Sequence, residues 1–264
     1  MIIIKFGGSV ITDKKTRYKF RSHVTDRLVK EFKSYAKKDQ IVLVHGAGSF
    51  GHILAEKYKL DKGFRSPQQL GKVAEVKKDV RELDLEVLKI MIRNGLNPMS
   101  ISPSAVITND NKKIVNINMT AFENPLEYKF IPVTFGDIVM DRSLGFSICS
   151  GDQIILKLAK KFKPSLVIFV TDVDGLYTKP PNTYKDAEFI DEIDLSSGSG
   201  LKLIKKVEAE MKVADVTGGI LTKVRISMDI ARSGVQTYII NGKVKDRLKE
   251  CLAGRKIKGT WIHG

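Results

Sequence analysis

Short apolar runs recur along the chain, and most of them stop at or just before a glycine or an aspartate. A run of this length that ends in a turn signal is typical of a buried β-strand. The pattern predicts strands at residues 2–6, 41–44, 131–134, 166–171 and 237–240, with a further short strand around residues 260–262. Residues 99–118 predict strands joined by hairpins, in which NDNKK is a turn.

Helical periodicity fills the segments between these strands. Apolar residues recur at intervals of three and four over residues 21–38 and over residues 73–92, where the pattern stops at Asn94-Gly95. Further helices are expected from about Asp152, over 201–212 and from Thr217 to about Ser233, and SSGSG (196–200) predicts a mobile loop. Alternating strands and helices indicate an α/β protein with an open, mainly parallel sheet sandwiched by helices.

Composition narrows the class of protein. The 264 residues, of which 42% are hydrophobic and 28% charged, are enough for one large α/β domain. No apolar run approaches the roughly 18 residues that span a membrane, and the first residues lack the layout of a signal peptide. Cys149 and Cys251 have neither metal-site nor disulfide-framework spacing. We therefore expect a cytoplasmic protein with no membrane partner.

The formal net charge of +15 has two explanations. The chain could present a surface to nucleic acid, or it could bind several phosphate groups while its other lysines face solvent. The lysines are spread along the whole chain, and no DNA- or RNA-binding motif is present. The second explanation is favoured, and we expect no nucleic acid as a partner.

Glycine-containing turns follow several of the apolar runs or stand where a helix is expected to begin. They are Gly7-Gly8-Ser9, Gly46-Ala47-Gly48, Ser150-Gly151-Asp152, residues 172–175 and residues 217–219. Glycines allow close approach of the backbone, and a helix N-terminus adds N–H donors, so such a turn can bind an anion. Turns at the carboxyl ends of parallel strands meet at one crevice. The set therefore predicts a site for more than one phosphate group.

Two common nucleotide-binding motifs do not account for this site. The Walker A pattern is absent from the sequence. The letters GAGSFG (46–51) match the dinucleotide-binding fingerprint, but no strand that ends in an acidic residue follows within about 20 residues.

Five motifs, in this order along the chain, resemble those of the amino acid kinase superfamily. They are KFGGSVITDK (5–14), VHGAGSFGH (44–52), SGD (150–152), TDVDGLY (171–177) and DVTGGILTK (215–223). The histidine after GAGSFG and the DVTGG block are narrower, and they resemble the archaeal-type isopentenyl phosphate kinases. Ala47 and Gln153 depart from the usual glycine and acid of the motifs.

The resemblance implies a fold and an activity. The chain would be a single amino acid kinase-like domain (1–264), with a phosphate-acceptor half (1–165) and a nucleotide-binding half (166–264), and it would form a homodimer. It would transfer a phosphoryl group from ATP to isopentenyl phosphate, giving isopentenyl diphosphate in an alternate mevalonate route to isoprenoids. Mg²⁺ would bridge the ATP phosphates and be held mostly by substrate and water, which implies no protein metal site.

Residue roles also follow from the resemblance. Because two anions must meet, catalysis is mainly positioning and charge neutralisation. Lys5, Lys14 and Lys223 would neutralise the phosphates, Asp152 would orient the lysines, and His52 would hold the acceptor phosphate. Expected ATP contacts are Lys5, Gly7, Gly8, Ser9, Gly48, Asp172, Tyr177, Gly219 and Lys223. Expected acceptor contacts are Ala47, Gly48, His52 and Gly151, with Val76, Val80, Leu83 and Ile148 around the isoprenoid tail.

Several alternatives stay open at this point. Lys14 and Lys15 are adjacent, and an exposed hairpin often carries lysines, so the sequence does not decide which one is catalytic. The apolar stripe at residues 76–87 is also typical of a core helix. Asp174 is typical of an Asx turn, and His45, at a strand end, is typical of a hydrogen-bonded structural histidine. Rival functions are a fosfomycin kinase-like enzyme for another small phosphate or phosphonate, and a non-catalytic nucleotide-binding regulator.

Overall fold

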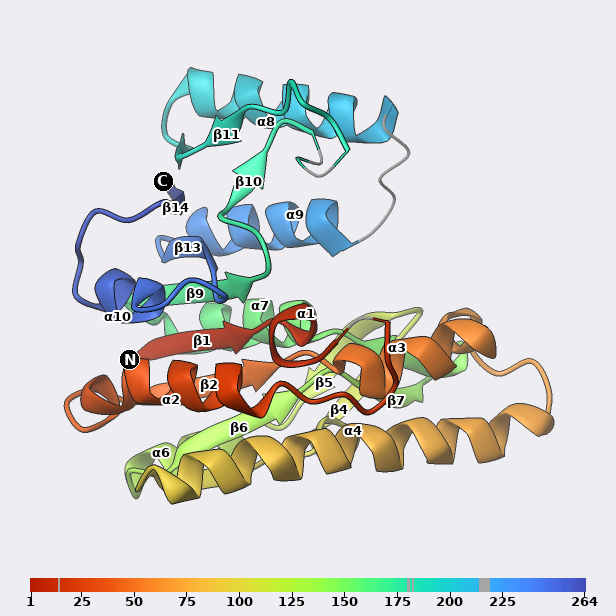
Figure 1. The fold of residues 1–264 in the computed structure, drawn as a ribbon. Helices are drawn as coiled ribbons and strands as arrows, with labels where there is room; N and C mark the ends of the chain where they lie inside the picture. Colours follow the sequence, from red (N-terminus) through yellow and green to blue (C-terminus); the bar gives the residue numbers. More distant parts are fainter. Residues whose placement is uncertain (14, 180, 182, 214–218) are drawn as a thin grey trace.

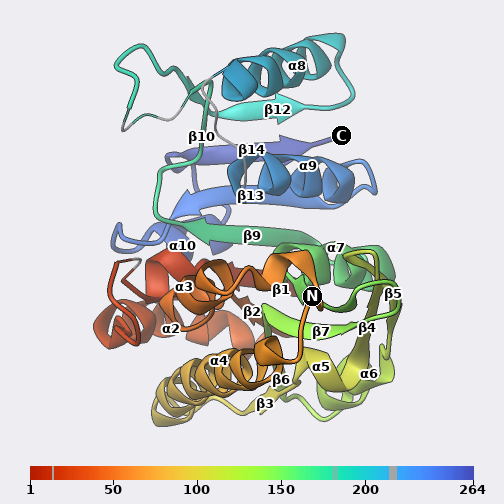
Figure 2. The ribbon, with the colours of Figure 1, turned by 90° about the vertical axis from the view of Figure 1, so that its right-hand side faces the viewer.

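The computed structural model describes residues 1–264 with the exception of 14, 180, 182 and 214–218. Its centre is an eight-stranded sheet in the order β12-β14-β13-β9-β1-β2-β6-β3, which Figure 2 shows from top to bottom. These strands are β1 (Ile2–Phe6), β2 (Ile41–His45), β3 (Pro98–Ser100), β6 (Ile131–Phe135), β9 (Leu166–Thr171), β12 (Glu192–Asp194), β13 (Gln236–Asn241) and β14 (Gly259–His263).

Most neighbours in this sheet are parallel, as the sequence predicts. β1 pairs in parallel with both β2 and β9, and β13 and β6 continue the parallel order on either side. The exception is β14, which is antiparallel to β13 and pairs in parallel with β12. Two smaller sheets accompany the central one. One has four strands in the order β5-β4-β7-β8, and the other has two strands, β10 and β11. These strands are β4 (Ile107–Asp110), β5 (Lys113–Ile117), β7 (Asp137–Asp141), β8 (Gly145–Cys149), β10 (Leu176–Tyr177) and β11 (Phe189–Ile190).

Helices cover both faces of the central sheet (Figure 1). They are α1 (Gly8–Ile11), α2 (Ser22–Ala36), α3 (Gly48–Lys57), the 3₁₀ turn η1 (Leu60–Lys62), α4 (Gln68–Arg93), α5 (Pro103–Val106), α6 (Thr120–Glu127), α7 (Gly151–Phe162), α8 (Gly198–Val213), α9 (Gly219–Ala231) and α10 (Arg247–Leu252). The expected α/β fold, an open and mainly parallel sheet between helices, is confirmed.

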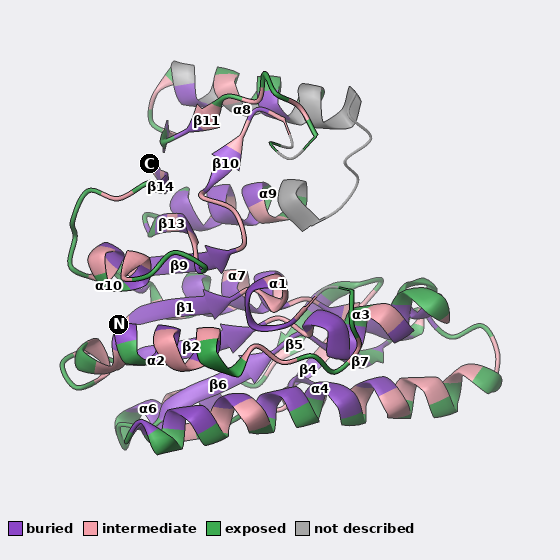
Figure 3. Cartoon of the chain, viewed as in Figure 1, coloured by how far each residue is buried: buried purple, intermediate pink, exposed green. Residues whose placement is uncertain are grey.

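Alternate residues of β1 show how the sheet separates two cores. Ile3 packs in a cluster with residues of α6, α7, α8 and α9, whereas Ile2, Ile4 and Phe6 pack in a cluster with residues of α1, α2, α4 and α10. Successive side chains of a strand point to opposite faces, so a strand between two layers must be apolar at every position. Both β1 and β2 are buried along their whole length, which Figure 3 shows for β1.

Two sequence-based predictions of secondary structure were wrong in part. The SSGSG segment is not all loop, because α8 begins at Gly198. The Ser197 hydroxyl accepts a hydrogen bond from the N–H of Gly200 at 3.2 Å, which is the geometry of a helix N-cap. The segment 99–118 contains the short helix α5 between its strands, and it starts at a proline, which suits a first helical position.

Candidate active site

Three turns meet at the carboxyl ends of β1, β2 and β9. The strands are adjacent and parallel, with Phe6 opposite His45 and Val170, so the turns that follow them lie side by side. The Ser9 hydroxyl, just after β1, donates a 2.9 Å hydrogen bond to Oδ1 of Asp172, just after β9. The convergence expected from the sequence is therefore present for these turns. The last turn, at 217–219, lies largely outside the described residues.

Glycine is required where the first two turns touch. A Cβ on Gly8 would lie 2.5 Å from the backbone nitrogen of Gly48, and a Cβ on Gly46 would lie 2.6 Å from that of Gly8. Gly48 also has a φ of +51°, and a Cβ there would collide with the side chain of Thr12. The Thr12 hydroxyl donates to Gly8 O at 2.7 Å and accepts from the Ser49 N–H at 3.0 Å, so it joins both turns.

Backbone donors are available at this place. Helices α1, α3 and α7 each begin directly after a strand, and the first N–H groups of a helix have no partner within it. Several N–H groups at or just before these helix starts form no hydrogen bond to another described residue, and we call five of them the N–H cluster. They belong to Gly8, Ser9, Ala47, Gly48 and Gly151. Such donors at helix N-termini bind phosphate oxygens well.

Two lysines flank a buried carboxylate beside the N–H cluster. Lys5 Nζ lies 2.8 Å from Asp152 Oδ1, and Lys223 Nζ lies 3.0 Å from Asp152 Oδ2. The exposed fractions of Lys5 and Asp152 are only 7% and 8%. A Cβ on Gly151 would lie 3.3 Å from Lys5 Cε, which places the lysine next to the start of α7. The sequence-predicted trio of Lys5, Asp152 and Lys223 is thus brought together from β1, α7 and α9.

Burial and the neighbouring charges set the protonation of this trio. Burial favours the neutral form of Asp152, but Lys5 and Lys223 outweigh it and lower the pKa of the carboxyl from 3.8 to about 2. Burial, followed by repulsion from Lys5, lowers the pKa of Lys223 from 10.5 to about 8, although Asp152 opposes that shift. The site near neutral pH therefore has an ionised carboxylate between two cationic side chains.

Gly136 lies close to two of the residues expected to contact the acceptor. At Gly136, the residue after β6, a Cβ would lie 3.5 Å from the nitrogen of Gly151 and 3.8 Å from that of Ala47. The nitrogens of Gly151 and Ala47 therefore lie close to the same point. His52 is exposed and lies on α3, one turn after the N-terminus that carries Ala47 and Gly48.

The apolar residues expected around an isoprenoid tail divide between two clusters. Val76, Val80 and Ile148 pack in one cluster that also contacts Ala47. Leu83 instead packs in the cluster beneath β1 and β2, and it is completely buried there. The first three residues therefore lie beside Ala47, and Leu83 lies deeper in the core.

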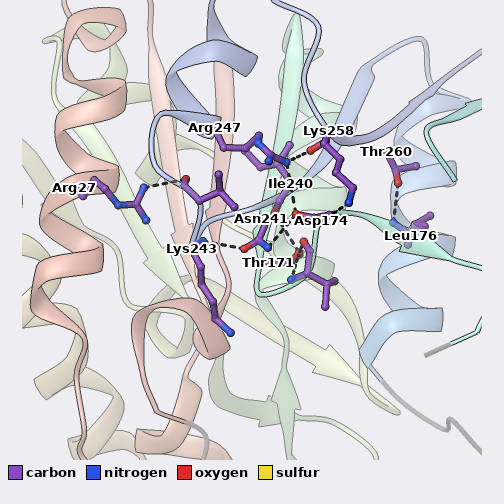
Figure 4. A network of polar contacts seen from close by, with 12 residues as sticks. Arg27, Thr171, Asp174, Leu176, Ile240, Asn241, Lys243, Arg247, Lys258 and Thr260 are labelled. Carbon is purple, nitrogen blue, oxygen red and sulfur yellow. Dashed lines mark hydrogen bonds and ion pairs between the residues drawn. The ribbon is translucent and has the colours of Figure 1, made fainter. Parts of the chain in front are cut away.

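Asp174, which follows β9, is the centre of a polar network (Figure 4). Its carboxylate accepts from Asn241 Nδ2 at 3.1 Å and lies 3.0 Å from Lys258 Nζ and 3.7 Å from Arg247 Nη1. These contacts fix residues 172–175 against the end of β13, the start of α10 and the loop after α10. The Tyr177 ring, on β10, packs against Phe189 at 5.3 Å. Asp172 and Tyr177 therefore lie on a well-supported segment, and Asp174 has more partners than an Asx turn requires.

Some sequence predictions cannot be placed, and some residues were missed. Lys14 lies outside the described residues, and Gly219 is placed only as the first residue of α9. Gly136 and Thr12 were not predicted as site residues. Gly136 follows an apolar run as Gly46 does, so the sequence did contain a signal for Gly136. No sequence signal marks Thr12.

Charged side chains that could form a metal site are absent from the described part of the chain, where no three His, Cys, Asp or Glu residues gather to bind an ion. No helix among the described residues has the length and apolar character needed to cross a membrane.

Comparison with known proteins gives the family. A sequence profile described as the amino acid kinase family matches residues 1–241. The isopentenyl phosphate kinase of Methanothermobacter thermautotrophicus is 34% identical over 272 aligned positions, which cover 100% of this chain and 99% of that one. Another, from Thermoplasma acidophilum, is 33% identical and covers 98% of this chain and 100% of its own. A solved isopentenyl phosphate kinase structure superposes with a TM-score of 0.83 at 32% identity over 99% of both chains. The chain belongs to the amino acid kinase family, within its isopentenyl phosphate kinase branch.

Proposed function

We propose that this protein transfers the γ-phosphoryl group of ATP to isopentenyl phosphate, giving isopentenyl diphosphate and ADP. The observation that carries the proposal is the ion-paired trio Lys5–Asp152–Lys223 beside the N–H cluster, in a chain similar over its whole length to isopentenyl phosphate kinases. Cations and N–H donors that converge on one space suit a reaction in which two phosphates must meet.

The lysines would neutralise charge as phosphoryl transfer proceeds. Lys5 and Lys223 are held next to each other by Asp152, so both cations are in place before ATP binds. Preorganised charge of this kind lowers the barrier because nothing needs to reorient during the reaction. Asp152 is not needed as a base, since the attacking phosphate oxygen is already ionised. Its role is to orient the two lysines.

The two parts of the crevice would divide the substrates. Ala47, Gly48, Gly151 and His52 would hold the acceptor phosphate, with Val76, Val80 and Ile148 beside its tail. Gly7, Gly8, Ser9 and Gly219 would contact the ATP phosphates, and Asp172 and Tyr177 the rest of the nucleotide. In this assignment residues 1–165 form the acceptor half and residues 166–264 form the nucleotide half.

A divalent cation fits this donor set only with the help of the substrate. The Asp152 carboxylate is occupied by two lysines and Asp172 accepts from Ser9, so the described residues offer no ready carboxylate cage. Mg²⁺ commonly keeps its waters and binds through substrate phosphates. We therefore propose that Mg²⁺ enters with ATP, where it would neutralise phosphate charge.

We also propose that the protein forms a homodimer. Light scattering after gel filtration would test this, and the expected mass is that of two chains.

A kinase assay with a panel of acceptors tests the function directly. Isopentenyl, dimethylallyl and geranyl phosphates would be compared with fosfomycin, uridine monophosphate and acetylglutamate, at fixed MgATP. We expect the largest kcat/KM for isopentenyl phosphate. A larger value for fosfomycin would favour a fosfomycin kinase-like enzyme instead. If ATP is not turned over with any acceptor, the remaining candidate is a non-catalytic nucleotide-binding regulator.

A further inference from the structure

His45, the last residue of β2, is completely buried and uses both of its ring nitrogens. Nδ1 lies 3.2 Å from the carbonyl oxygen of Gly46, and Nε2 lies 3.2 Å from Oδ1 of Asp84 on α4. The other oxygen of Asp84 accepts a 2.5 Å hydrogen bond from the Ser100 hydroxyl. The ring also stacks on Phe135, with centroids 5.3 Å apart. The imidazole therefore has one defined orientation.

The partners of the ring assign its protons. A carbonyl oxygen only accepts hydrogen bonds, so Nδ1 must carry the hydrogen that it donates to Gly46 O. Nε2 faces Oδ1 of Asp84, which holds the ring from its other side. A buried polar group without a partner costs free energy, so Asp84 and Ser100 keep the ring from turning away from Gly46.

This contact fixes the direction of the next N–H group. The Gly46 N–H already donates to Phe6 O at 2.9 Å, and the Gly46 carbonyl is turned toward His45. In a planar trans peptide, the C=O of one residue and the N–H of the next point in opposite directions. The Ala47 N–H must therefore point away from His45. It belongs to the N–H cluster, and its nitrogen lies 3.8 Å from the position of a Cβ on Gly136, which is also 3.5 Å from the nitrogen of Gly151.

We propose that His45 is a positioning residue, which orients the Ala47 N–H toward the phosphate of the acceptor through the Gly46 carbonyl. The proposal rests on the proposed function for the identity of that phosphate. His45 itself does not touch the substrate. Its contribution is to hold one donor in place before the acceptor arrives, which is when preorganised donors are most effective.

Two substitutions separate this role from a structural one. In His45→Asn, the side-chain amide can take the place of Nδ1 and donate to Gly46 O, while the bond to Asp84 is lost. In His45→Gln, the longer side chain can reach Asp84 but no longer donates to Gly46 O. Both variants lose the stacked ring, so a merely structural role predicts similar losses of thermal stability and similar kinetics for both.

Steady-state kinetics give the first readout. For His45→Gln we expect kcat/KM for isopentenyl phosphate to fall about tenfold or more, with KM for ATP within about twofold of wild type. His45→Asn should recover most of that loss. Equal kinetic losses in the two variants, or a full loss in His45→Asn alone, would overturn the proposal.

A binding readout separates this inference from the proposed function. Protein labelled with ¹⁵N-alanine would be titrated with inorganic phosphate, without ATP, while the Ala47 amide resonance is followed. We expect the resonance to move in wild type and His45→Asn, and to move much less in His45→Gln. If wild type responds in this way but does not phosphorylate isopentenyl phosphate, the proposed function fails and the role of His45 stands. An equal response in all three proteins contradicts the role of His45.

Discussion

Lys223 Nζ lies 3.0 Å from Asp152 Oδ2, although the two residues are 71 positions apart in the sequence. This ion pair joins α9 to α7. Lys5 Nζ, from β1, lies 2.8 Å from the other oxygen of the same carboxylate, Asp152 Oδ1. The protein therefore brings a buried carboxylate and two lysines together from three separate elements. Since the lysines repel each other, the carboxylate between them is what allows both charges to remain in the site.

The lowered pKa of Lys223 predicts a pH dependence. Burial holds this pKa at about 8, so the free protein loses the ammonium charge as pH rises through that value. We expect kcat/KM for ATP to fall about tenfold per pH unit above pH 8. Lys223→Arg keeps its charge and should remove that fall, even if its overall rate is lower. A wild-type profile that is level to pH 10 would contradict the assignment.

Substitution of Lys14 and of Lys15, each by alanine, shows which of the two adjacent lysines is catalytic. Lys14→Ala and Lys223→Ala should each lower kcat by about 100-fold or more, because each removes a charge that stabilises the transition state. Lys15→Ala is the control, since Lys15 is exposed and we assign it no role in transfer. Single-turnover rates on the three variants measure the effect. A large loss of rate in Lys15→Ala, with none in Lys14→Ala, would assign the catalytic role to Lys15 instead of Lys14.

Loss of the His52 side chain should affect the acceptor and not the nucleotide. Its imidazole adds a directional donor next to the N–H groups of Ala47 and Gly48, and a phosphate dianion there favours the charged ring. We expect His52→Ala to abolish detectable transfer, while His52→Gln keeps one donor and partial activity. Calorimetric ATP binding should stay within a few-fold of wild type. His23→Ala, another exposed histidine, is the control. Near-normal turnover by His52→Ala would remove this residue from the mechanism.

A methyl group at Gly136 should block the acceptor without disturbing the fold. The added Cβ would lie 3.5 Å or more from every described neighbour, which is ordinary contact, but it would stand between the N–H groups of Gly151 and Ala47. We expect Gly136→Ala to raise KM for isopentenyl phosphate about tenfold or more, with KM for ATP unchanged. Gly71→Ala, where nothing lies within 4 Å, is the matched control. Unchanged kinetics would mean that the acceptor phosphate binds elsewhere.

The chain length of the accepted substrate should depend on the α4 residues that pack beside Ala47. Val80→Ala should raise the ratio of geranyl to isopentenyl phosphate turnover, because Val80 packs with Val76 and Ile148 beside Ala47. Leu83→Ala tests whether the slot reaches the deeper cluster, at a cost of about 2–5 kcal/mol in the free energy of unfolding. Ratios that stay at the wild-type value in both variants would place the slot away from this helix.

The central strands and the turns after them were predictable because they depend on local sequence. Residues 2–6 and 166–171 must be apolar on both faces, and that requirement is visible as an unbroken run. The glycines after β1 and β2 were visible as well, since only glycine allows the two backbones to approach as Gly8 and Gly48 do.

The contacts that hold residues 15–20 against α4 could not be predicted in this way. The Arg17 guanidinium donates to Glu75 at 2.6 Å and to Asp79 at 2.7 Å, and the Tyr18 hydroxyl donates to Asp79 at 2.8 Å. Asp79 is completely buried on α4. A lysine-rich hairpin looks exposed in the sequence, and a lone aspartate in a helix looks solvated. Their pairing depends on how α4 packs against α3, which no local pattern encodes.

The position of β1 between β2 and β9 has a consequence for dividing the protein. Ile2 is paired with Ile41 on one side and with Leu166 on the other, so the bond network of the sheet crosses the boundary between residues 165 and 166. A break there would leave β1 and β9 each with an unpaired edge and two apolar faces, which is the usual starting point for aggregation. A fragment made of either proposed half alone, residues 1–165 or 166–264, would therefore lack a finished sheet.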